Sequence, residues 1–327
     1  MSNLCLVTGA NGHLGNNLVR ELLERGETVR AGVRDTHHIE MFKGLDCEIV
    51  YTEMQDKEAM LKALKGVDVL YHVAAVFKHW AKDPEAEIIR PNVTGTEIVL
   101  EAAAEAKVKK IVYISSVAAV GHNGEPLNES SWNDDLSNAY YSSKIQSEKR
   151  AWELAKKHKL WMVSVLPSAM VGPFANRLTD TMQFLESIRN NSLSVNPKFF
   201  FNFVDVRDVA KGIYASAIKG KSGNRYILAN STSSSLSEII EVVKFEGSNS
   251  KLPPVLPKWL LYFVAWCLEL VATVTGKPAE MIRSQVKLFY GVRQEYDITK
   301  ARTELGYEPR SSSIALIEAF IYLEDKH

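Results

Sequence analysis

The sequence predicts an α/β fold, a doubly wound parallel sheet that carries a smaller discontinuous substrate-binding region. Short apolar runs alternate with helical patterns up to residue 120, and a glycine-rich turn follows the first of these runs. In addition, 46% of the 327 residues are hydrophobic, which is enough for a large core.

The elements behind this prediction follow one another in a regular order. Strands are expected at Leu4–Thr8, Thr28–Val33, Glu48–Tyr51, Val67–Val73, Lys110–Ile114 and Trp161–Leu166. Helices are expected at His13–Arg25, Lys57–Leu64, Glu85–Ala106 and Asn138–His158. Alternation at this spacing indicates βαβ units with right-handed connections, so the sheet should be parallel and doubly wound.

The turn after the first predicted strand, "VTGANGHLG", predicts a phosphate-binding loop. Gly9 permits a tight turn, Gly12 lets the backbone approach a pyrophosphate, and Gly15 lets helix and strand pack closely. The following helix presents unpaired N–H groups and a positive dipole end to an anion. In a βαβ array this pattern indicates a Rossmann-type dinucleotide site. The loop residues expected at the cofactor are Gly9, Asn11, Gly12, His13, Leu14 and Gly15.

The end of the second predicted strand favours NADP(H) over NAD. NAD-binding proteins usually place an acid there, which accepts both ribose hydroxyls. Spacing from Gly26 puts Val33 at this place, and its side chain can accept no hydrogen bond. Arg34 comes next and suits a 2′-phosphate through paired, charge-assisted hydrogen bonds, which Arg30 could assist. The alternative is that Arg34 is a surface charge paired with Asp35.

The segment "AYYSSK" supplies a candidate acid–base pair. Tyr140 and Lys144 stand at positions i and i+4 of a predicted helix and therefore share a face, whereas Tyr141 is rotated by roughly 100°. A phenol has a pKa of about 10, which a nearby ammonium and a positive nicotinamide should lower. Tyr140 could then exchange a proton with a carbonyl or alcohol oxygen.

These motifs together resemble the extended short-chain dehydrogenase/reductase family, which includes NAD-dependent epimerases and dehydratases. "TGANGHLG", "DVLYHVAA", "NVTGTEIVLEAA", "IVYISSVAAVG", "YYSSK", "NFVDVRDVA" and "DITKARTELGYEPR" occur in the family's order and cover nearly the whole chain. Within the family, "VRAGVRD" and the tail look like the dihydroflavonol-reductase and 3β-hydroxysteroid-dehydrogenase-like branch.

The resemblance implies roles for individual residues. Ser116, with Ser115 as the alternative, would hold the substrate oxygen, and Lys144 would bind the nicotinamide ribose. Asn92 would support the site. The residues that the resemblance places along the cofactor are Ala74, Ala75 and the stretch from Pro167 to Val171.

Two departures from the family pattern bear on the site. Glu53 and Met54 are expected at the cofactor, but at Glu53 the family commonly has an Asp that contacts adenine, and Glu is longer. Val117 and Ala118 stand where the family's sugar dehydratases carry acidic residues, so dehydration is not expected.

The leading hypothesis is therefore an NADP(H)-dependent oxidoreductase that reduces an aldehyde or ketone, or oxidises a secondary alcohol, of a fairly apolar small molecule. Phe77, Trp80 and Phe199–Phe201 could line its pocket or belong to the core. One alternative is a nucleotide-sugar epimerase, a class that usually prefers NAD. Another is a non-catalytic NADP-binding sensor, although such proteins commonly lose the tyrosine or the lysine.

The segment Trp259–Thr275 is nearly all apolar but contains Glu269. It has about the minimum length of a membrane span, and a charge in mid-membrane is unfavourable. We expect a buried or lid helix that lines an apolar substrate cavity, with a helix resting on a membrane surface as the alternative.

The domain organisation follows from where the strand and helix pattern loosens. Residues 1–167, 203–230 and the C-terminal tail are assigned to the NADP-binding Rossmann domain. Residues 168–202 and 231–296 are assigned to the substrate-binding region, which Pro197 and the Pro253–Pro254 pair interrupt.

Composition limits the partners and the compartment. Lys plus Arg equals Asp plus Glu at 39 each, so no nucleic-acid partner is expected. Three scattered cysteines fit a reducing compartment, here the cytoplasm, and no His or Cys pattern predicts a metal site. The helix that follows Tyr140 could form the face of a homodimer.

Overall fold

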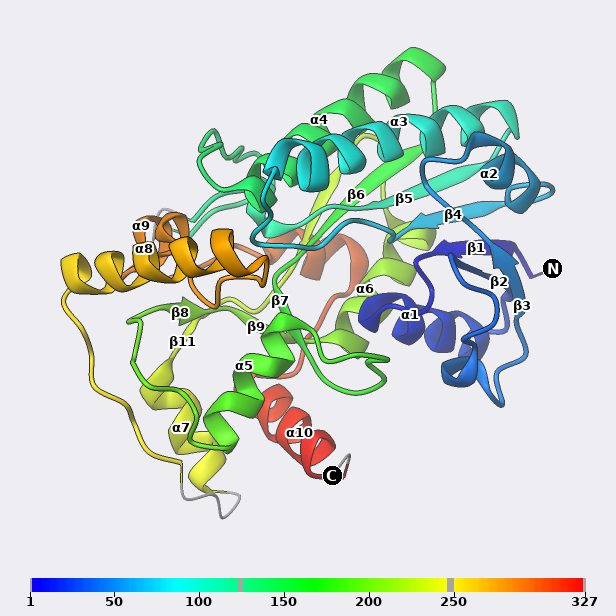
Figure 1. Ribbon diagram of the computed structural model, residues 1–327. Helices are drawn as coiled ribbons and strands as arrows, with labels where there is room; N and C mark the ends of the chain where they lie inside the picture. Colours follow the sequence, from blue (N-terminus) through cyan, green and yellow to red (C-terminus); the bar gives the residue numbers. More distant parts are fainter. Residues whose placement is uncertain (1, 123–125, 246–249, 326–327) are drawn as a thin grey trace.

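Seven parallel strands form one central sheet in the computed structural model, which describes residues 2–122, 126–245 and 250–325 (Figure 1). Its order is β10-β6-β5-β4-β1-β2-β3, so the order reverses between β1 and β4. The strands are β1 Leu4–Thr8, β2 Thr28–Val33, β3 Glu48–Tyr51, β4 Val69–His72, β5 Lys110–Ile114, β6 Met162–Pro167 and β10 Arg225–Leu228. The predicted Rossmann-type α/β fold is confirmed, and ligands of such sheets bind where the order reverses.

Helices cover both faces of this sheet (Figure 1). On one face lie α2 (Lys57–Ala63), α3 (Arg90–Glu105) and α4 (Ala139–His158), which share an apolar core cluster with the strands. On the other face lie α1 (His13–Glu24) and α6 (Val206–Lys219), which share a second cluster. Each helix buries one apolar stripe, which is why the sequence shows helical periodicity there.

The helix expected at Glu85–Ala106 is divided. A π-helical turn, η2 (Glu85–Ile89), runs into α3. Pro91 stands in the first turn of α3, and it has no N–H to bond to the preceding turn. The periodicity of the sequence continues through this turn, so the division was not predicted.

The second half contains more regular structure than its sequence pattern suggests. Two short strand pairs, β7 (Ala169–Val171) with β9 (Phe203–Asp205) and β8 (Phe200–Phe201) with β11 (Ser234–Ser235), lie beside the main sheet. Its helices are α5 Asp180–Arg189, α7 Leu236–Phe245, α8 Lys258–Thr275, α9 Arg283–Phe289 and α10 Ser312–Glu324. The remaining short helices are η1 Glu40–Phe42, η3 Val117–Ala119 and η4 Ala301–Leu305.

The C-terminal tail contacts both parts of the molecule. η4 packs on α6 and β10 of the main domain, whereas α10 shares an apolar cluster with α5 and α7. The division of the chain into the two regions that we assigned from the sequence stays a prediction.

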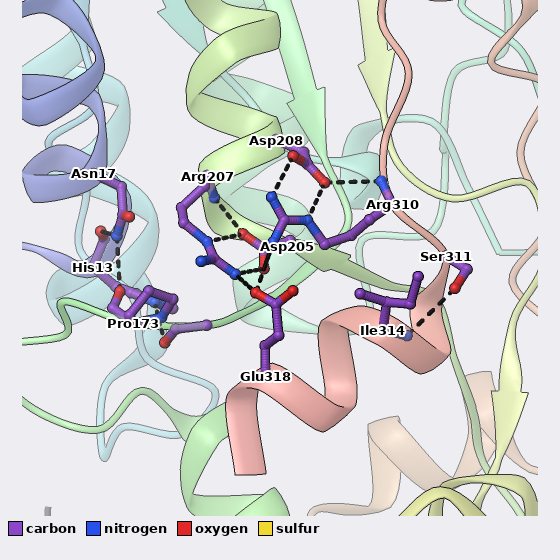
Figure 2. A network of polar contacts seen from close by, with 11 residues as sticks. His13, Asn17, Pro173, Asp205, Arg207, Asp208, Arg310, Ser311, Ile314 and Glu318 are labelled. Atoms are coloured by element: carbon purple, nitrogen blue, oxygen red, sulfur yellow. Dashed lines mark hydrogen bonds and ion pairs between the residues drawn. The ribbon is translucent and has the colours of Figure 1, made fainter. Parts of the chain in front are cut away.

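A network of charges fixes α10 to the junction of β9 and α6 (Figure 2). Arg310 pairs with Asp208 at 2.9 Å and with the fully buried Asp205 at 3.4 Å. Arg207 pairs with Asp205 and with Glu318 of α10. The motifs "NFVDVRDVA" and "GYEPR", which are about a hundred residues apart in the sequence, therefore meet in space.

Candidate active site

The glycine-rich turn lies at the C-terminal end of β1, where the strand order reverses. Gly9 has a φ of 65°, and a Cβ there would lie 3.0 Å from Ala74 Cα. A Cβ on Gly15 would lie 2.2 Å from the Gly9 carbonyl oxygen, so α1 approaches this closely only without a side chain. Gly12 is exposed and caps α1 without a side-chain hydrogen bond. The first N–H groups of the helix can thus face an anion.

A buried polar contact ties β1 to the end of β4. Thr8 Oγ1 accepts hydrogen bonds from the N–H groups of Val73 and Ala74, both at 3.1 Å, and lies 3.0 Å from His72 Nδ1. Burial lowers the pKa of His72 to about 3, and Lys144 adds a smaller like-charge effect. The neutral ring can therefore accept a hydrogen bond from the Thr8 hydroxyl at Nδ1. Sequence reasoning missed this tie, which sets the position of the segment after β4.

The end of β2 presents one unpaired cation. Val33 is buried, and the exposed Arg34 makes no hydrogen bond or ion pair with any residue that the structure describes. Asp35 instead pairs with His38 at 2.6 Å. The alternative pairing of Arg34 with Asp35 is therefore wrong, and the guanidinium remains available for a phosphate.

Arg30 is held elsewhere. Its Nε lies 2.8 Å from Glu48 Oε2, and its Nη1 donates to the carbonyl oxygens of Ala63 at 2.6 Å and Lys65 at 3.1 Å. Because these contacts occupy the guanidinium, the expected assistance of Arg30 at the ribose is not found.

The predicted adenine contacts lie just beyond β3. Glu53 is half-buried, and its Oε1 accepts a hydrogen bond from the Gln55 N–H at 3.3 Å. The Met54 side chain packs on α3 at Gly95, and it lies so close that a Cβ on Gly95 would be 2.7 Å from the Met54 sulfur. Both residues stay predictions as cofactor contacts.

The structure distinguishes the two serines at the end of β5. Ser115 is buried, and its Oγ donates to Glu148 Oε2 at 2.7 Å. Ser116 Oγ accepts from the Ala118 N–H at 3.2 Å and lies 3.4 Å from the Tyr140 hydroxyl. Ser116 is therefore the serine beside the candidate acid–base group.

The two tyrosines of α4 have different surroundings, as their helical positions require. Tyr140 faces Ser116, whereas Tyr141 packs against His122 and Phe289, with both ring-centroid distances at 5.6 Å. Asn138 begins the helix, because its Oδ1 accepts from the Tyr141 N–H at 3.2 Å. This cap fixes the register that we predicted.

Burial shifts the pKa of both members of the pair. Burial raises the pKa of Tyr140, and the contact with Ser116 opposes this shift. Burial also lowers the pKa of Lys144 from 10.5 to about 8, with Glu148 opposing it. The phenol pKa of Tyr140 is thus raised in the protein alone, and the expected lowering, which includes the charge of a bound nicotinamide, stays a prediction.

A small cavity of about 10 Å³, with room for about one water molecule, lies beside Lys144. Its lining residues are His72, Ala74, Ala75, Asn92, Thr96, Tyr113, Ile114, Lys144 and Ser147. Asn92 holds the wall of this cavity: its Oδ1 accepts from the Val76 N–H at 2.7 Å, and its Nδ2 donates to the Val76 carbonyl oxygen at 2.9 Å and to Ser143 Oγ at 3.3 Å. These contacts agree with the supporting role that the resemblance implied for Asn92.

Sequence reasoning also missed a buried ion pair behind the site. Arg225 Nε lies 2.8 Å from Glu148 Oε1, and its Nη2 lies 3.1 Å from Oε2. Arg225 also donates to the carbonyl oxygens of Glu129, Ser131 and Ala119. Because Glu148 comes one turn after Lys144, an i+4 acid on the site helix was the available signal.

Two aromatic rings from the segment after β4 pack against Tyr140. The rings of Phe77 and His79 lie 5.0 and 5.2 Å from the Tyr140 ring. His79 was not predicted; it is half-buried, and its Nε2 lies 3.8 Å from Asp180 Oδ2. Trp80 is half-buried in the same segment, and its ring does not contact that of Tyr140 in the described part of the chain.

The predicted nicotinamide wall is tied to the glycine loop. His13 Nε2 lies 3.0 Å from the Gly172 carbonyl oxygen, and Asn17 donates to the Pro173 carbonyl oxygen at 2.9 Å (Figure 2). These contacts join α1 to the residues directly after Val171. Pro167 ends β6 on the same side of the sheet.

An apolar cluster borders Tyr140 from the second region. Its buried members are Ala118, Tyr141, Phe199, Leu261, Ala265, Val286, Leu288 and Phe289. Tyr140 and Phe201 pack against it, so Phe199 and Phe201 serve both as core and as surroundings of the site. Within the described residues, no group of three or more His, Cys, Asp or Glu side chains could hold a metal ion.

Comparison with known proteins gives a consistent family. The sequence model of the NAD dependent epimerase/dehydratase family matches residues 5–229. The chain is 32% identical to a Synechocystis protein named "Putative dihydroflavonol 4-reductase", over 99% of this chain and 96% of that protein. It is 30% identical to sterol demethylase protein B of Methylococcus capsulatus, over 98% of both chains.

Solved structures share the fold. The crystal structure of gox2253 superposes with a TM-score of 0.86 at 31% identity, covering 99% of both chains. The yeast methylglyoxal/isovaleraldehyde reductase Gre2, complexed with NADPH, superposes with a TM-score of 0.76 at 21% identity, again covering 99% of both chains.

Proposed function

Because this chain belongs to the NAD dependent epimerase/dehydratase family of extended short-chain dehydrogenases/reductases, we propose that it is an NADP(H)-dependent oxidoreductase for apolar carbonyl compounds or secondary alcohols. Two contacts at the carboxyl ends of the strands carry the proposal: the Tyr140 hydroxyl lies 3.4 Å from Ser116 Oγ, and Lys144 lines a cavity with Ala74, against which Gly9 packs. A nucleotide site and an acid–base group thus meet at the reversal of strand order.

The residues present fit a dinucleotide. The uncapped N-terminus of α1 suits a pyrophosphate, and the glycine loop leaves room for a close backbone approach. Arg34, which is unpaired within the described chain, would hold a 2′-phosphate beside the buried Val33. A bound nicotinamide would supply or accept the hydride.

The chain's own residues would handle the proton. Ser116 Oγ and the Tyr140 hydroxyl would both contact the substrate oxygen, and Tyr140 would donate its proton to that oxygen in the direction of reduction. Lys144 is buried on the same helix face, and in its charged form it favours the phenolate that remains. The positive charge of an oxidised nicotinamide would also stabilise the Tyr140 phenolate.

The surroundings of Tyr140 favour an apolar substrate. Phe77 and His79 cover the phenol ring, and the apolar cluster that contains Phe199 and Leu261 lies behind it. The names of the two relatives, a dihydroflavonol reductase and a sterol demethylase protein, fit ring-containing apolar substrates.

Nucleotide-sugar epimerisation is the second candidate, since the family includes it. The absence of an acid at Val33 and the unpaired Arg34 favour the reductase instead. A non-catalytic NADP sensor is disfavoured because both Tyr140 and Lys144 are present. A cytoplasmic location and a homodimer through α4 remain predictions.

Three variants test the acid–base assignment, with NADPH for a panel of aldehydes and ketones and with NADP+ for steroid-like alcohols. Tyr140→Phe should lower turnover by roughly a hundredfold or more and leave NADPH affinity nearly unchanged. Lys144→Ala should lose both turnover and affinity. Tyr141→Phe is the matched control and should stay active, because Tyr141 packs against His122 and Phe289 instead. An inactive Tyr141→Phe beside a normal Tyr140→Phe would refute the assignment.

Cofactor titrations test the NADP preference. NADPH should bind more tightly than NADH to the wild type, and Arg34→Ala should remove most of the difference. Arg30→Ala is the control, since Arg30 is held by Glu48 and Ala63 and should not change the ratio of the two affinities. Equal affinities in the wild type would contradict the preference.

A further inference from the structure

One face of α8 is an exposed apolar stripe. Among the described residues, α8 is the helix with the length and apolarity of a membrane span. Only 17% of it is buried, so the expectation of a buried helix is wrong. The stripe consists of Trp259, Phe263, Trp266, Leu270 and Val274, with exposed fractions of 71%, 55%, 40%, 47% and 85%. Their spacing of three or four residues puts all five on one side of the helix.

The opposite face fixes the helix to the protein. Leu261, Ala265 and Ala272 are buried, and the first two pack in the cluster that contains Tyr141. Glu269 points to α9, where its carboxylate accepts hydrogen bonds from the N–H of Arg283 at 2.7 Å and from its guanidinium at 2.6 Å. Glu269, which interrupts the apolar sequence, is therefore paired with Arg283 on the side of α8 that faces the protein. The stripe itself contains no charged residue.

Lysines without an ion pair in the described chain stand at both ends of the stripe, and Lys258 Nζ donates to the Lys287 carbonyl oxygen at 3.4 Å. Lys258 begins α8 and, with Lys198, approaches the face of Tyr290. Lys277 follows the other end of α8. Lys82 also lies near that end, since its ammonium would be 3.6 Å from a Cβ on Gly276, the residue that caps the helix. Within the described chain, none of these four lysines makes an ion pair. Glu280 is an exposed acid that follows the helix.

We propose that α8 docks on the surface of an anionic lipid bilayer, with the stripe in the interfacial region and the lysines at the headgroups. Tryptophan and phenylalanine favour this region, and basic side chains add attraction to anionic lipids. Spanning would require α8 to leave α9 and break the pair of Glu269 with Arg283. A symmetric dimer through the antiparallel stripe would bring the two lysine-bearing ends together, and like charges oppose such a contact.

Vesicle sedimentation tests the proposal on the full-length protein. The wild type should sediment with vesicles of phosphatidylcholine and phosphatidylglycerol at 7:3, and at least tenfold less with phosphatidylcholine alone. Leu270→Glu should lower binding to the mixed vesicles by tenfold or more. Ile321→Glu is the matched control, because Ile321 on α10 is 44% exposed and lies outside the stripe. The double variant Lys258→Gln/Lys277→Gln should bind less to the anionic vesicles and should bind to phosphatidylcholine vesicles as the wild type does.

Three outcomes would overturn the proposal. The first is a folded wild type that does not sediment with anionic vesicles. The second is a dimer in lipid-free buffer that Leu270→Glu dissociates, which would assign the stripe to a second copy. The third is resistance of the bound protein to carbonate extraction, which would show spanning. Circular dichroism of every variant serves as the test of folding, and the inference does not depend on which cofactor or reaction the site uses.

Discussion

Arg225→Met tests the buried ion pair behind the active site. Arg225 and Glu148 are 7% and 0% exposed, and the substitution leaves the carboxylate buried beside Ser115 and Trp152 without its cation. Breaking a buried pair from one side costs about 3–5 kcal/mol. A chain of this length has an entropy of unfolding of about 0.7 kcal/mol/K, so the melting temperature should fall by roughly 4–7 °C.

Thermal unfolding followed by circular dichroism measures this change. The double variant Glu148→Leu/Arg225→Met removes both charges and should recover part of the loss, because apolar replacements of buried pairs are often neutral. Its recovery should be incomplete, since Arg225 also satisfies the carbonyl oxygens of Glu129 and Ser131. The reasoning is refuted if Arg225→Met melts within a degree of the wild type, or if the double variant is the least stable of the three.

Two further perturbations follow from the same geometry. Gly15→Ala should weaken NADPH binding by roughly tenfold or more, about 1.4 kcal/mol. The new methyl group would lie 2.2 Å from the Gly9 carbonyl oxygen, so the N-terminus of α1 must move. Unchanged affinity in a fluorescence titration would contradict this. Burial lowers the pKa of His72 to about 3, so below about pH 6.5 the unfolded chain binds a proton at this residue that the folded chain does not bind. The contribution of His72 to stability is therefore fully present above pH 6.5 and is lost as the pH falls toward 3. His72→Gln should therefore lose stability less steeply than the wild type between these values; parallel curves of melting temperature against pH would count against a neutral buried ring.

The main sheet and the outline of the site could be predicted from local patterns. Short apolar runs located six of the seven strands of the main sheet to within a residue or two, because a strand buried between two helical layers needs apolar side chains along its length. The edge strand β10 was not predicted. The positions of Gly9, Gly12 and Gly15, and of Tyr140 with Lys144, depend on spacing within one turn or one helix. Such short-range constraints are visible in the sequence itself.

Contacts between distant segments were decided only by the tertiary structure. Two adjacent serines look alike in the sequence, and only the buried Glu148 shows that Ser115 is bound and that Ser116 faces Tyr140. Arg30 looked available until Glu48 and the Ala63 carbonyl group were placed beside it.

The same holds for the two charges that sequence reasoning weighed most heavily. Glu269 interrupts an apolar run in the sequence, but in the fold it turns to Arg283 and leaves the outer face of α8 uncharged. Lys144 shares a helix face with Tyr140 in the sequence, but only the fold shows that burial lowers the pKa of Lys144 and raises that of Tyr140 in the protein alone. A sequence reports which side chains share a helix face, whereas burial and ion pairing depend on what the rest of the chain packs against that face.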